Sequence, residues 1–322
     1  MEQLKKNKKE VGNKLSDFEI IKELGKGSYG TVYTIKSLLN SQIYVMKKMD
    51  INHLKPNQQQ ECHREVSILK KVSHPNIIKY YSSFIEQEIL YIIMEYAELG
   101  DLYSLIKHYK KHGKYFNELD LWKITSEILS GLEYLHSKKI IHRDIKSGNI
   151  VVNSITKELN VIDWGLSEYY VENYKYCTRV GTRYYKAPEL LLDYKKYDYA
   201  IDLWSVGCIF GAILFQKDFL FKGEDINDQL VKIANVFGFQ EIENYLNKYK
   251  NETKISQKSL DQIKNYTKKE WTSFINQNNK YLINDEALDL LDKLLKFDHE
   301  ERINAKDALN HPYFKDLDEK YK

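Results

Sequence analysis

The middle of the chain contains several polar residues whose types and spacing could do chemistry together. Residues 142–149 read HRDIKSGN, and a DWG triplet follows at 163–165. Phosphoryl transfer needs a carboxylate that orients the attacking hydroxyl, an amide and a second carboxylate that hold magnesium, and a cation beside the moving phosphoryl group. These roles are predicted for Asp144, Asn149, Asp163 and Lys146, in that order.

A hairpin is predicted between the two groups of candidate residues. The short apolar runs at 150–152 and 159–162 flank a polar turn at 154–158. Two antiparallel strands of this kind would return Asp163 beside Asn149, so both ligands could face one cation. Taken singly, each of these residues could merely cap a turn or end a strand. The ordered set favours the catalytic interpretation.

A glycine-rich motif, GKGSYGTV, lies near the N-terminus. This GxGxxG pattern alone fits a dinucleotide-binding fold or a plain hairpin equally well. A dinucleotide fingerprint would open a helix, whereas residues 31–35 continue as a strand. Glycine lets the backbone approach phosphates, and Val32 can press on a base. The nucleotide-contacting residues predicted here are Gly25, Lys26, Gly27, Ser28, Gly30 and Val32.

A lysine on the third predicted strand has a candidate partner on the following helix. Lys47, in YVMK, is placed to touch the α- and β-phosphates of a nucleotide. Residues 58–72 have helical spacing, with an apolar face that includes Val66 and Leu69. Glu65 on this helix would pair with Lys47. The alternative is a solvent-facing glutamate, whose surface ion pair would be worth little.

An apolar strand at 90–93 runs into a small polar linker at 94–101. This is where two lobes of the molecule would join. The backbone of Glu95 and Ala97 is then placed to bond an adenine, and Met94 would fill the back of the pocket. Any buried edge strand would look similar. From residue 102 onward the pattern is mostly helical.

Composition agrees with a soluble catalytic domain. The 322 residues are 43% hydrophobic and 30% charged, and the net charge of +3 argues against wholesale nucleic-acid binding. The apolar run at 206–215 is about half the length of a membrane span. The lysine-rich N-terminus fits neither a secretory signal nor myristoylation. Three widely spaced cysteines indicate a reducing compartment, so we expect a cytoplasmic or nuclear location.

These residues together resemble the eukaryotic protein kinase family over residues 18–314. The resemblance implies an α+β, bilobal fold, with a small antiparallel β-sheet lobe and one helix at 18–97 and a larger, mainly α-helical lobe at 98–314. It places MgATP between the lobes. A basic tail at 1–17 and a short tail at 315–322 would flank them.

Further motifs of the larger lobe belong to the same resemblance. Lys146, together with Thr182 ahead of the APE triplet at 187–189, is typical of the Ser/Thr type rather than the Tyr type. Arg302 would be the buried partner of Glu189, and Asp202 would brace the catalytic-loop backbone.

Four stretches of the larger lobe resemble the casein kinase II catalytic (alpha) subunit: VIDWGLSEYY, RVGTRYYKAPELLLDYKKYDYAIDLWSVGC, DINDQLVKIANVFG and EALDLLDKLLKFDHEERINAKDALNHPYF. DWG in place of DFG is the sharpest sign, and Val45 fits the same family. The resemblance implies a constitutively active, acid-directed Ser/Thr kinase that uses ATP, with GTP as an alternative nucleotide. It also assigns Val45 and Val151 to nucleotide binding.

By position, Arg179, Arg183 and Lys186 would form a basic pocket for acidic groups just after the target hydroxyl, with Thr182 beside them. The alternative is that one arginine pairs with Glu189 or a neighbouring carboxylate. The expected partners are protein substrates with acidic residues near Ser or Thr. Neither nucleic acid nor a membrane is expected as a partner.

The smaller lobe departs from casein kinase II and is closer to NimA-related and general kinases. A Gln58-Gln59-Gln60-Glu61 run stands where casein kinase II carries lysines. This departure weakens the expectation of a regulatory β-type subunit and of polyanion binding. Trp164 is hypothesised to hold Asp163 inward through its N–H group, so that activity would not require phosphorylation. Two further alternatives remain: a dual-specificity kinase that autophosphorylates tyrosine, and a pseudokinase scaffold.

Overall fold

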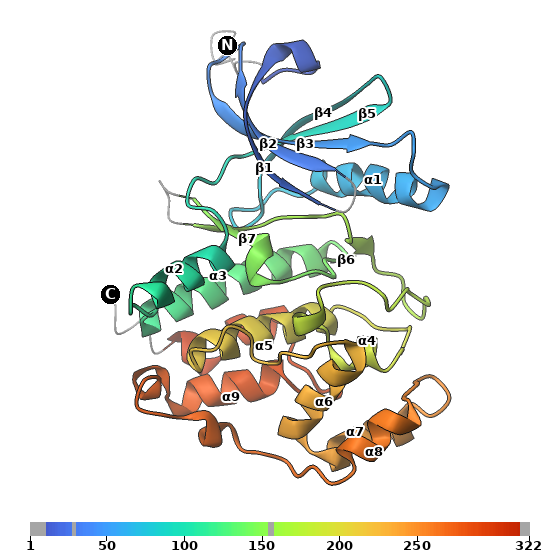
Figure 1. Cartoon of the computed structure of the whole chain (residues 1–322), viewed down its shortest axis with the longest axis vertical. Helices are drawn as coiled ribbons and strands as arrows, with labels where there is room; N and C mark the ends of the chain where they lie inside the picture. The colour runs from blue at the N-terminus through green and yellow to red at the C-terminus, as the bar shows by residue number, and fades with distance from the viewer. Residues whose placement is uncertain (1–10, 28–29, 154–157, 316–322) are drawn as a thin grey trace, which may run out of the picture.

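The computed structural model describes residues 11–27, 30–153 and 158–315. Two lobes are stacked along the long axis of the molecule, one formed by a β-sheet with α1 and the other mainly by helices (Figure 1). The strands are β1 (Phe18–Lys26), β2 (Thr31–Ser37), β3 (Ile43–Asp50), β4 (Tyr80–Glu86), β5 (Ile89–Met94), β6 (Ile140–Ile141), β7 (Ile150–Val152), β8 (Leu159–Val161) and β9 (Glu168–Tyr169). The α-helices are α1 (Pro56–Leu69), α2 (Leu102–Lys111), α3 (Glu118–Ser137), α4 (Pro188–Leu191), α5 (Ala200–Leu214), α6 (Ile226–Phe237), α7 (Phe239–Lys248), α8 (Gln257–Ile263), α9 (Asp285–Leu294) and α10 (Ala305–Leu309).

The smaller lobe is a five-stranded antiparallel sheet in the order β1-β2-β3-β5-β4. Side chains alternate between the two faces of a strand. On β3, Tyr44 and Met46 therefore join the apolar cluster of the outer face. Val45 and Lys47 point to the inner face. The predicted antiparallel sheet is confirmed, and the strand register sends Lys47 toward the larger lobe.

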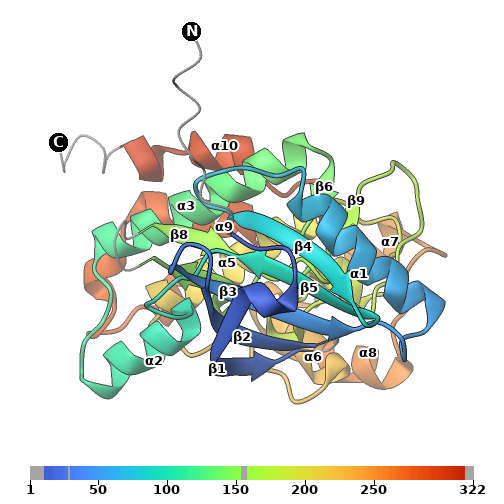
Figure 2. The ribbon, with the colours of Figure 1, turned by 90° about the horizontal axis from the view of Figure 1, so that it is seen from above.

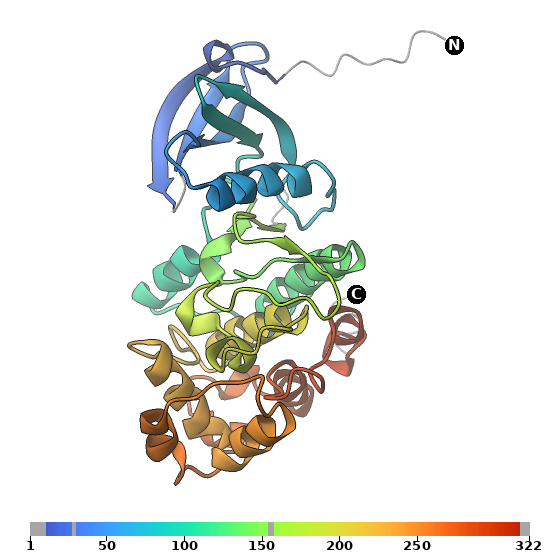
Figure 3. The same cartoon turned by 90° about the vertical axis from the view of Figure 1, so that its right-hand side faces the viewer.

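Helix α1 covers one side of this sheet, as the view from the side shows (Figure 3). It begins with Pro56, whose missing N–H costs nothing in the first turn of a helix. The face with Cys62, Val66 and Leu69 is buried, as its spacing predicts. Glu65 on α1 is also buried, and buried carboxylates nearly always have a partner. The view from above shows α1 running alongside β4 and β5 (Figure 2).

The larger lobe is built around α5, nearly every residue of which is buried. A single apolar cluster runs from Met49 and Leu69 in the smaller lobe to Tyr313 near the end of the larger lobe. Glu189 and Arg302 form a fully buried ion pair beneath it, with N–O distances of 2.7 and 3.1 Å. The predicted partnership of these two residues is confirmed. No helix among the described residues is long and apolar enough to span a membrane.

The last part of the predicted N-terminal tail packs against the sheet. Ser37 Oγ donates to the carbonyl of Val11 and Ser82 Oγ to that of Gly12, both at 2.8 Å. Val11 and Leu15 also contact the outer apolar cluster. Residues 11–17 thus pack against the smaller lobe, which is predicted to begin at residue 18. Residues 1–10 and 316–322, most of the two predicted tails, lie outside the described residues, as do Ser28 and positions 154–157 of the predicted turn.

Candidate active site

Lys47 links the two lobes through its ammonium group. Its Nζ donates to Glu65 Oε1 at 2.7 Å and to Oε2 at 2.8 Å, and it lies 3.5 Å from Asp163 Oδ1. The structure thus pairs Lys47 with Glu65, as expected, and adds Asp163 as a second carboxylate. Glu65 is buried and is not a surface glutamate. The pair therefore fixes α1 against β3.

Electrostatics keeps Lys47 and Asp163 charged. Burial opposes the charge on Lys47, but Glu65 and Asp163 together raise the pKa of Lys47 well above its usual value. Partial desolvation likewise works against the charge of the Asp163 carboxylate. Lys47, His142 and Lys146 outweigh it and hold the pKa of Asp163 below its usual range. A cation and an anion are thus maintained side by side at neutral pH.

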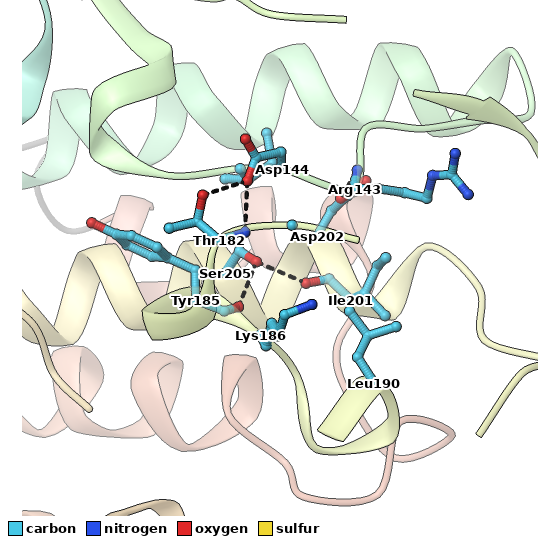
Figure 4. A pocket seen from close by; sticks show the side chains of 11 residues that line it. Arg143, Asp144, Thr182, Tyr185, Lys186, Leu190, Ile201, Asp202 and Ser205 are labelled. Atoms are coloured by element: carbon cyan, nitrogen blue, oxygen red, sulfur yellow. Dashed lines mark hydrogen bonds between the residues drawn. The ribbon is translucent and has the colours of Figure 1, made fainter. Parts of the chain in front are cut away.

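The Asp144 carboxylate is held from both sides. Lys146 Nζ donates to Asp144 Oδ2 at 2.7 Å, and Asn149 Nδ2 donates to the same oxygen at 3.0 Å. On the other side, the backbone N–H and the hydroxyl of Thr182 both donate to Oδ1 at 2.8 Å (Figure 4). Lys146 also reaches Thr182 Oγ1 at 3.1 Å. The carboxylate therefore has one orientation, fixed by its neighbours.

A buried aspartate on α5 shapes the loop that carries Asp144. Asp202 accepts from the backbone N–H groups of His142 and Arg143, both at 2.9 Å, and lies 3.0 Å from His136 Nε2. Burial disfavours its charge, but His136, His142 and these donors lower the pKa of Asp202 below its ordinary value. The predicted brace is present. It supports Arg143 in a left-handed conformation, with φ of 67°.

The β7–β8 hairpin brings Asn149 and Asp163 together. Ile150 pairs with Val161 and Val152 with Leu159, and Ile162 N donates to Asn149 O at 2.9 Å. Asp163 then turns with φ of 66°, a conformation that an aspartate tolerates better than most residues. The predicted strands on both sides of the turn are confirmed.

Asn149 and Asp163 fit a magnesium ion. The amide nitrogen of Asn149 is engaged by Asp144, which leaves its carbonyl oxygen for a cation. The Asp163 side chain is 47% exposed, and its Oδ2 has no hydrogen-bond partner among the described residues. Amide and carboxylate oxygens are hard ligands of the kind that magnesium prefers. The donor set therefore fits the ion that the sequence predicts.

The glycines of the β1–β2 hairpin play different parts. A Cβ on Gly25 would meet nothing within 4 Å, and one on Gly27 only Gly30 O at 3.7 Å. Both glycines therefore face open space that phosphates could use. A Cβ on Gly30 would lie 2.1 Å from Lys48 O. Gly30 is required by the close approach of β3, and its contact with phosphate stays a prediction.

Apolar residues expected to contact the nucleotide lie on β2, β3 and β7. Val32 pairs with Lys47 across β2 and β3, and Val45 pairs with Met94 across β3 and β5. Val151 faces Asp101 in the linker. Sequence reasoning missed Leu24, which stands beside Gly25 and is 47% exposed in spite of its apolar side chain. Its signal was an aliphatic residue directly before the first glycine.

The linker between the lobes has backbone groups that make no hydrogen bond to other described residues. Glu95 N donates to Lys79 O at 2.9 Å, so only its carbonyl is available to a base. Ala97 makes no backbone hydrogen bond to another described residue. Met94 is buried at the end of β5. The Glu95 carbonyl and the backbone of Ala97 are therefore the groups that could bond a base, and the contact with adenine stays a prediction.

The three cations of the predicted basic pocket do not share one environment. Arg179 is exposed, whereas Lys186 is buried and donates to the carbonyls of Thr178 and Val180. Burial lowers the pKa of Lys186. Lys186 turns inward and lines the small cavity behind Asp144 (Figure 4). Its expected contact with substrate is therefore not seen, because backbone carbonyls already bind it.

Arg183, the third cation of the predicted basic pocket, is held by its neighbours. Its Nη1 donates to Glu224 O, and its guanidinium lies 5.1 Å from the Tyr184 ring centre. Arg183 Nε is buried without a hydrogen-bond partner among the described residues. The alternative in which Glu189 binds an activation-segment arginine is not observed, since Arg302 binds Glu189.

Trp164 does not act as the sequence suggested. It is 1% exposed and packs edge-on against His142, with ring centres 5.2 Å apart. Its Nε1 has no hydrogen-bond partner among the described residues. The hypothesis that this N–H holds Asp163 inward is therefore unsupported. The Trp164 ring packs against the catalytic loop.

The fold and this cluster define an enzyme that transfers phosphoryl groups from a nucleotide. The family model described as the protein kinase domain matches residues 18–314, and the chain belongs to this family. Membership carries with it protein substrates and the use of ATP with Mg²⁺.

Proposed function

We propose that the protein is a serine/threonine kinase that transfers the γ-phosphate of ATP to Ser or Thr side chains of proteins. The observation that carries this proposal is the set of contacts around Asp144. Lys146 Nζ touches both Asp144 and Thr182, and Thr182 occupies the second oxygen of the carboxylate. This arrangement positions a carboxylate, a cation and a hydroxyl-bearing segment around one point.

In the proposed reaction, Asp144 orients the substrate hydroxyl and accepts its proton. Lys146, 2.7 Å from that carboxylate, offsets negative charge on the transferring group. Lys47 holds the α- and β-phosphates and is itself held by Glu65. Asn149 and Asp163 would hold magnesium, which neutralises phosphate charge when bound. The positions of these side chains supply most of the catalysis.

Leu24, Val32, Val45 and Val151 would enclose the adenine, with Met94 behind it. The carbonyl of Glu95 and the backbone of Ala97 would bond its edge. Backbone groups of this kind also offer contacts to guanine, so GTP is included as a second nucleotide. Competition between the two nucleotides in a transfer assay tests this part.

We extend the proposal to acid-directed substrates. Arg179 is exposed, and Arg183 Nε is buried and lacks an acceptor among the described residues. A carboxylate or phosphate next to the target hydroxyl would pair with the exposed Arg179 and with the part-exposed guanidinium of Arg183. Lys186 is excluded from the pocket because backbone carbonyls bind it. A site of two arginines predicts a narrower preference than the three cations expected from sequence.

A peptide library tests the specificity. The expected result is faster phosphorylation of peptides with Asp or Glu after the acceptor, and loss of that preference in Arg183→Glu. Lys175→Glu, an exposed change on the same segment, serves as the control. Equal rates on acidic and basic peptides would contradict acid direction and leave the kinase proposal intact.

Tyrosine autophosphorylation is a second candidate activity. Tyr174 is 57% exposed on the activation segment, whereas the Tyr176 hydroxyl is engaged by the backbone of Val171. Tyr174 is thus the accessible one of this pair. Phosphopeptide mapping after incubation with ATP would detect it, and unmodified Tyr174 would remove the dual-specificity alternative. A cytoplasmic or nuclear location and a regulatory β-type subunit are further proposals.

A further inference from the structure

A carboxylate on β9 lies between two arginines from different parts of the molecule. Glu168 Oε2 is 2.8 Å from Nη1 of Arg64 on α1 and 3.7 Å from Nη2 of Arg143 in the catalytic loop. β9 pairs with β6, and Glu168 stands opposite Ile141, just before that loop. One oxygen atom therefore bridges the helix of the smaller lobe and the catalytic loop of the larger lobe.

Both arginines are fixed by further contacts. Arg64 Nε donates to Ser167 O at 3.0 Å, and Arg143 Nε donates to Leu166 O. Arg143 Nη1 also donates to the Tyr197 hydroxyl at 3.3 Å. Tyr197 in turn donates to Cys177 O at 2.8 Å. The network thus continues from α1 into the activation segment.

The ion pairs are not ordinary surface pairs. The side chain of Arg143 is 7% exposed, and those of Arg64 and Glu168 are 23% and 21% exposed. Exposed pairs contribute little, but partly buried charges left without a counter-charge are destabilising. Two guanidinium groups held this close together would repel each other without the carboxylate. Glu168 is thus the group on which the arrangement depends.

Each of the two arginines is directly followed in the sequence by a residue of the candidate active site. Arg64 directly precedes Glu65, which binds Lys47, and Arg143 directly precedes Asp144. The guanidinium group of Arg143 extends away from Asp144 (Figure 4). Glu168 therefore acts on the site through the backbone that carries these two residues.

We propose that Glu168 is a positioning residue that holds α1, the catalytic loop and the activation segment in the active arrangement without a phosphate. This inference rests on the proposed kinase function and supplies a physical basis for constitutive activity. Arginine–phosphate pairs order activation segments in kinases that are switched by phosphorylation. Here the genetically encoded carboxylate already occupies both arginines. Phosphorylation of Tyr174 or Thr178 would find neither of them free.

Phosphorylation of Thr178 would not strengthen the activation segment. Its hydroxyl donates to Asp193 Oδ1 at 2.6 Å, and the residue is buried. A phosphate there would displace this bond and stand beside a carboxylate, which repels it. The activation segment is therefore held by Glu168 and by uncharged contacts, and gains nothing from modification at this position.

The test compares Glu168→Gln with Glu172→Gln by hydrogen exchange and by turnover. Glu172 is exposed on the same segment and has no ion pair among the described residues, so it is a matched loss of charge. We expect Glu168→Gln to increase amide exchange in residues 64–70 and 166–180 and to lower kcat about tenfold, with a smaller change in the KM for peptide. Glu172→Gln should change neither quantity.

Two further variants separate positioning from a general loss of stability. Glu168→Asp keeps the charge and should recover most of the activity. In a double-mutant cycle, the loss in the double variant should be smaller than the sum of the losses in Arg64→Gln and Glu168→Gln, because both remove the Arg64–Glu168 pair. Additive losses would overturn the proposal.

Phosphatase treatment supplies the last comparison. The unmodified protein should retain full turnover after treatment, and loss of turnover would contradict the inference. The exchange measurement needs no substrate, so it reports on Glu168 even if the protein fails to phosphorylate peptides. Unchanged exchange in Glu168→Gln would refute the positioning role, whereas altered exchange with no transfer in any variant would refute the proposed function alone.

Discussion

Lys47 illustrates how single residues determine this site. Its ammonium group is buried, and two carboxylates from different lobes compensate the cost of that burial. Glu65 is the closer of the two and contacts Lys47 through both oxygens. If Glu65 lost its charge, Asp163 would be the remaining carboxylate that pairs with Lys47 among the described residues. The ammonium would then move toward the proposed magnesium ligand.

Glu65→Gln is therefore expected to lower kcat/KM for ATP by roughly 30-fold, which corresponds to about 2 kcal/mol of lost transition-state stabilisation. Steady-state kinetics with varied ATP measures this. Glu19→Gln, an exposed change on β1, is the control and should be silent. A Glu65→Gln enzyme with unchanged kinetics would show that the pair does not position Lys47.

At the scale of elements, two structural devices shape the site. The β1–β2 hairpin approaches β3 so closely at Gly30 that no side chain fits. The loop from β6 to β7 is held by Asp202, which accepts two backbone N–H groups and contacts His136. Both devices set backbone geometry, and neither residue needs to touch substrate.

The two glycines of the hairpin should respond differently to alanine. Gly30→Ala is expected to destabilise the protein by about 1–3 kcal/mol, because its Cβ would overlap Lys48 O. Gly27→Ala should leave the free energy of unfolding nearly unchanged and weaken ATP binding. Urea denaturation and nucleotide titration separate the two effects. Equal stability of both variants would contradict the assigned roles.

The contribution of Asp202 should depend on pH. Its pKa lies below the ordinary value of 3.8 in the folded protein, so its stabilisation is present above that value and is lost as the pH falls through the folded pKa. Asp202→Asn should lower the free energy of unfolding at pH 5 by about 1–3 kcal/mol, as measured by urea denaturation. The difference in free energy of unfolding between the unmodified protein and the variant should be smaller at pH 3.5. A gap that widens on acidification would reverse the expected sign.

Local patterns sufficed to predict several of these elements. The alternation of β7 and β8 and the helical spacing of α1 predicted how Asn149 meets Asp163 and why Glu65 faces Lys47. The inward turn of Lys186 was not predictable, because it depends on carbonyls that only the folded activation segment presents. The bridge through Glu168 was also missed, since it joins segments distant in sequence.

At the scale of the whole molecule, one apolar cluster runs through both lobes. Within the larger lobe, the fully buried pair of Glu189 and Arg302 ties α4 to the loop just before α10. Arg302 also donates to Ala200 O at 2.8 Å, at the start of α5. The pair thus connects three distant segments beneath the site. Its loss should affect folding before it affects chemistry.

Arg302→Met is expected to destabilise the protein by about 3–5 kcal/mol, because Glu189 would remain buried without a counter-charge. The double variant Glu189→Leu/Arg302→Met should recover much of this loss. Lys296→Gln, which removes a more exposed pair with Asp292, should cost less than about 1 kcal/mol. Denaturant unfolding measures all three. Similar stability of Arg302→Met and Lys296→Gln would contradict a structural role for the buried pair.

The most direct test of the central claim is transfer of the labelled γ-phosphate of ATP to a Ser/Thr peptide by the purified protein and by its Asp144→Asn variant. The account predicts phosphoserine or phosphothreonine with the unmodified protein. For the variant it predicts turnover at least about a hundredfold lower, with nucleotide binding retained. Equal transfer by the two proteins, or no transfer by either, would contradict it.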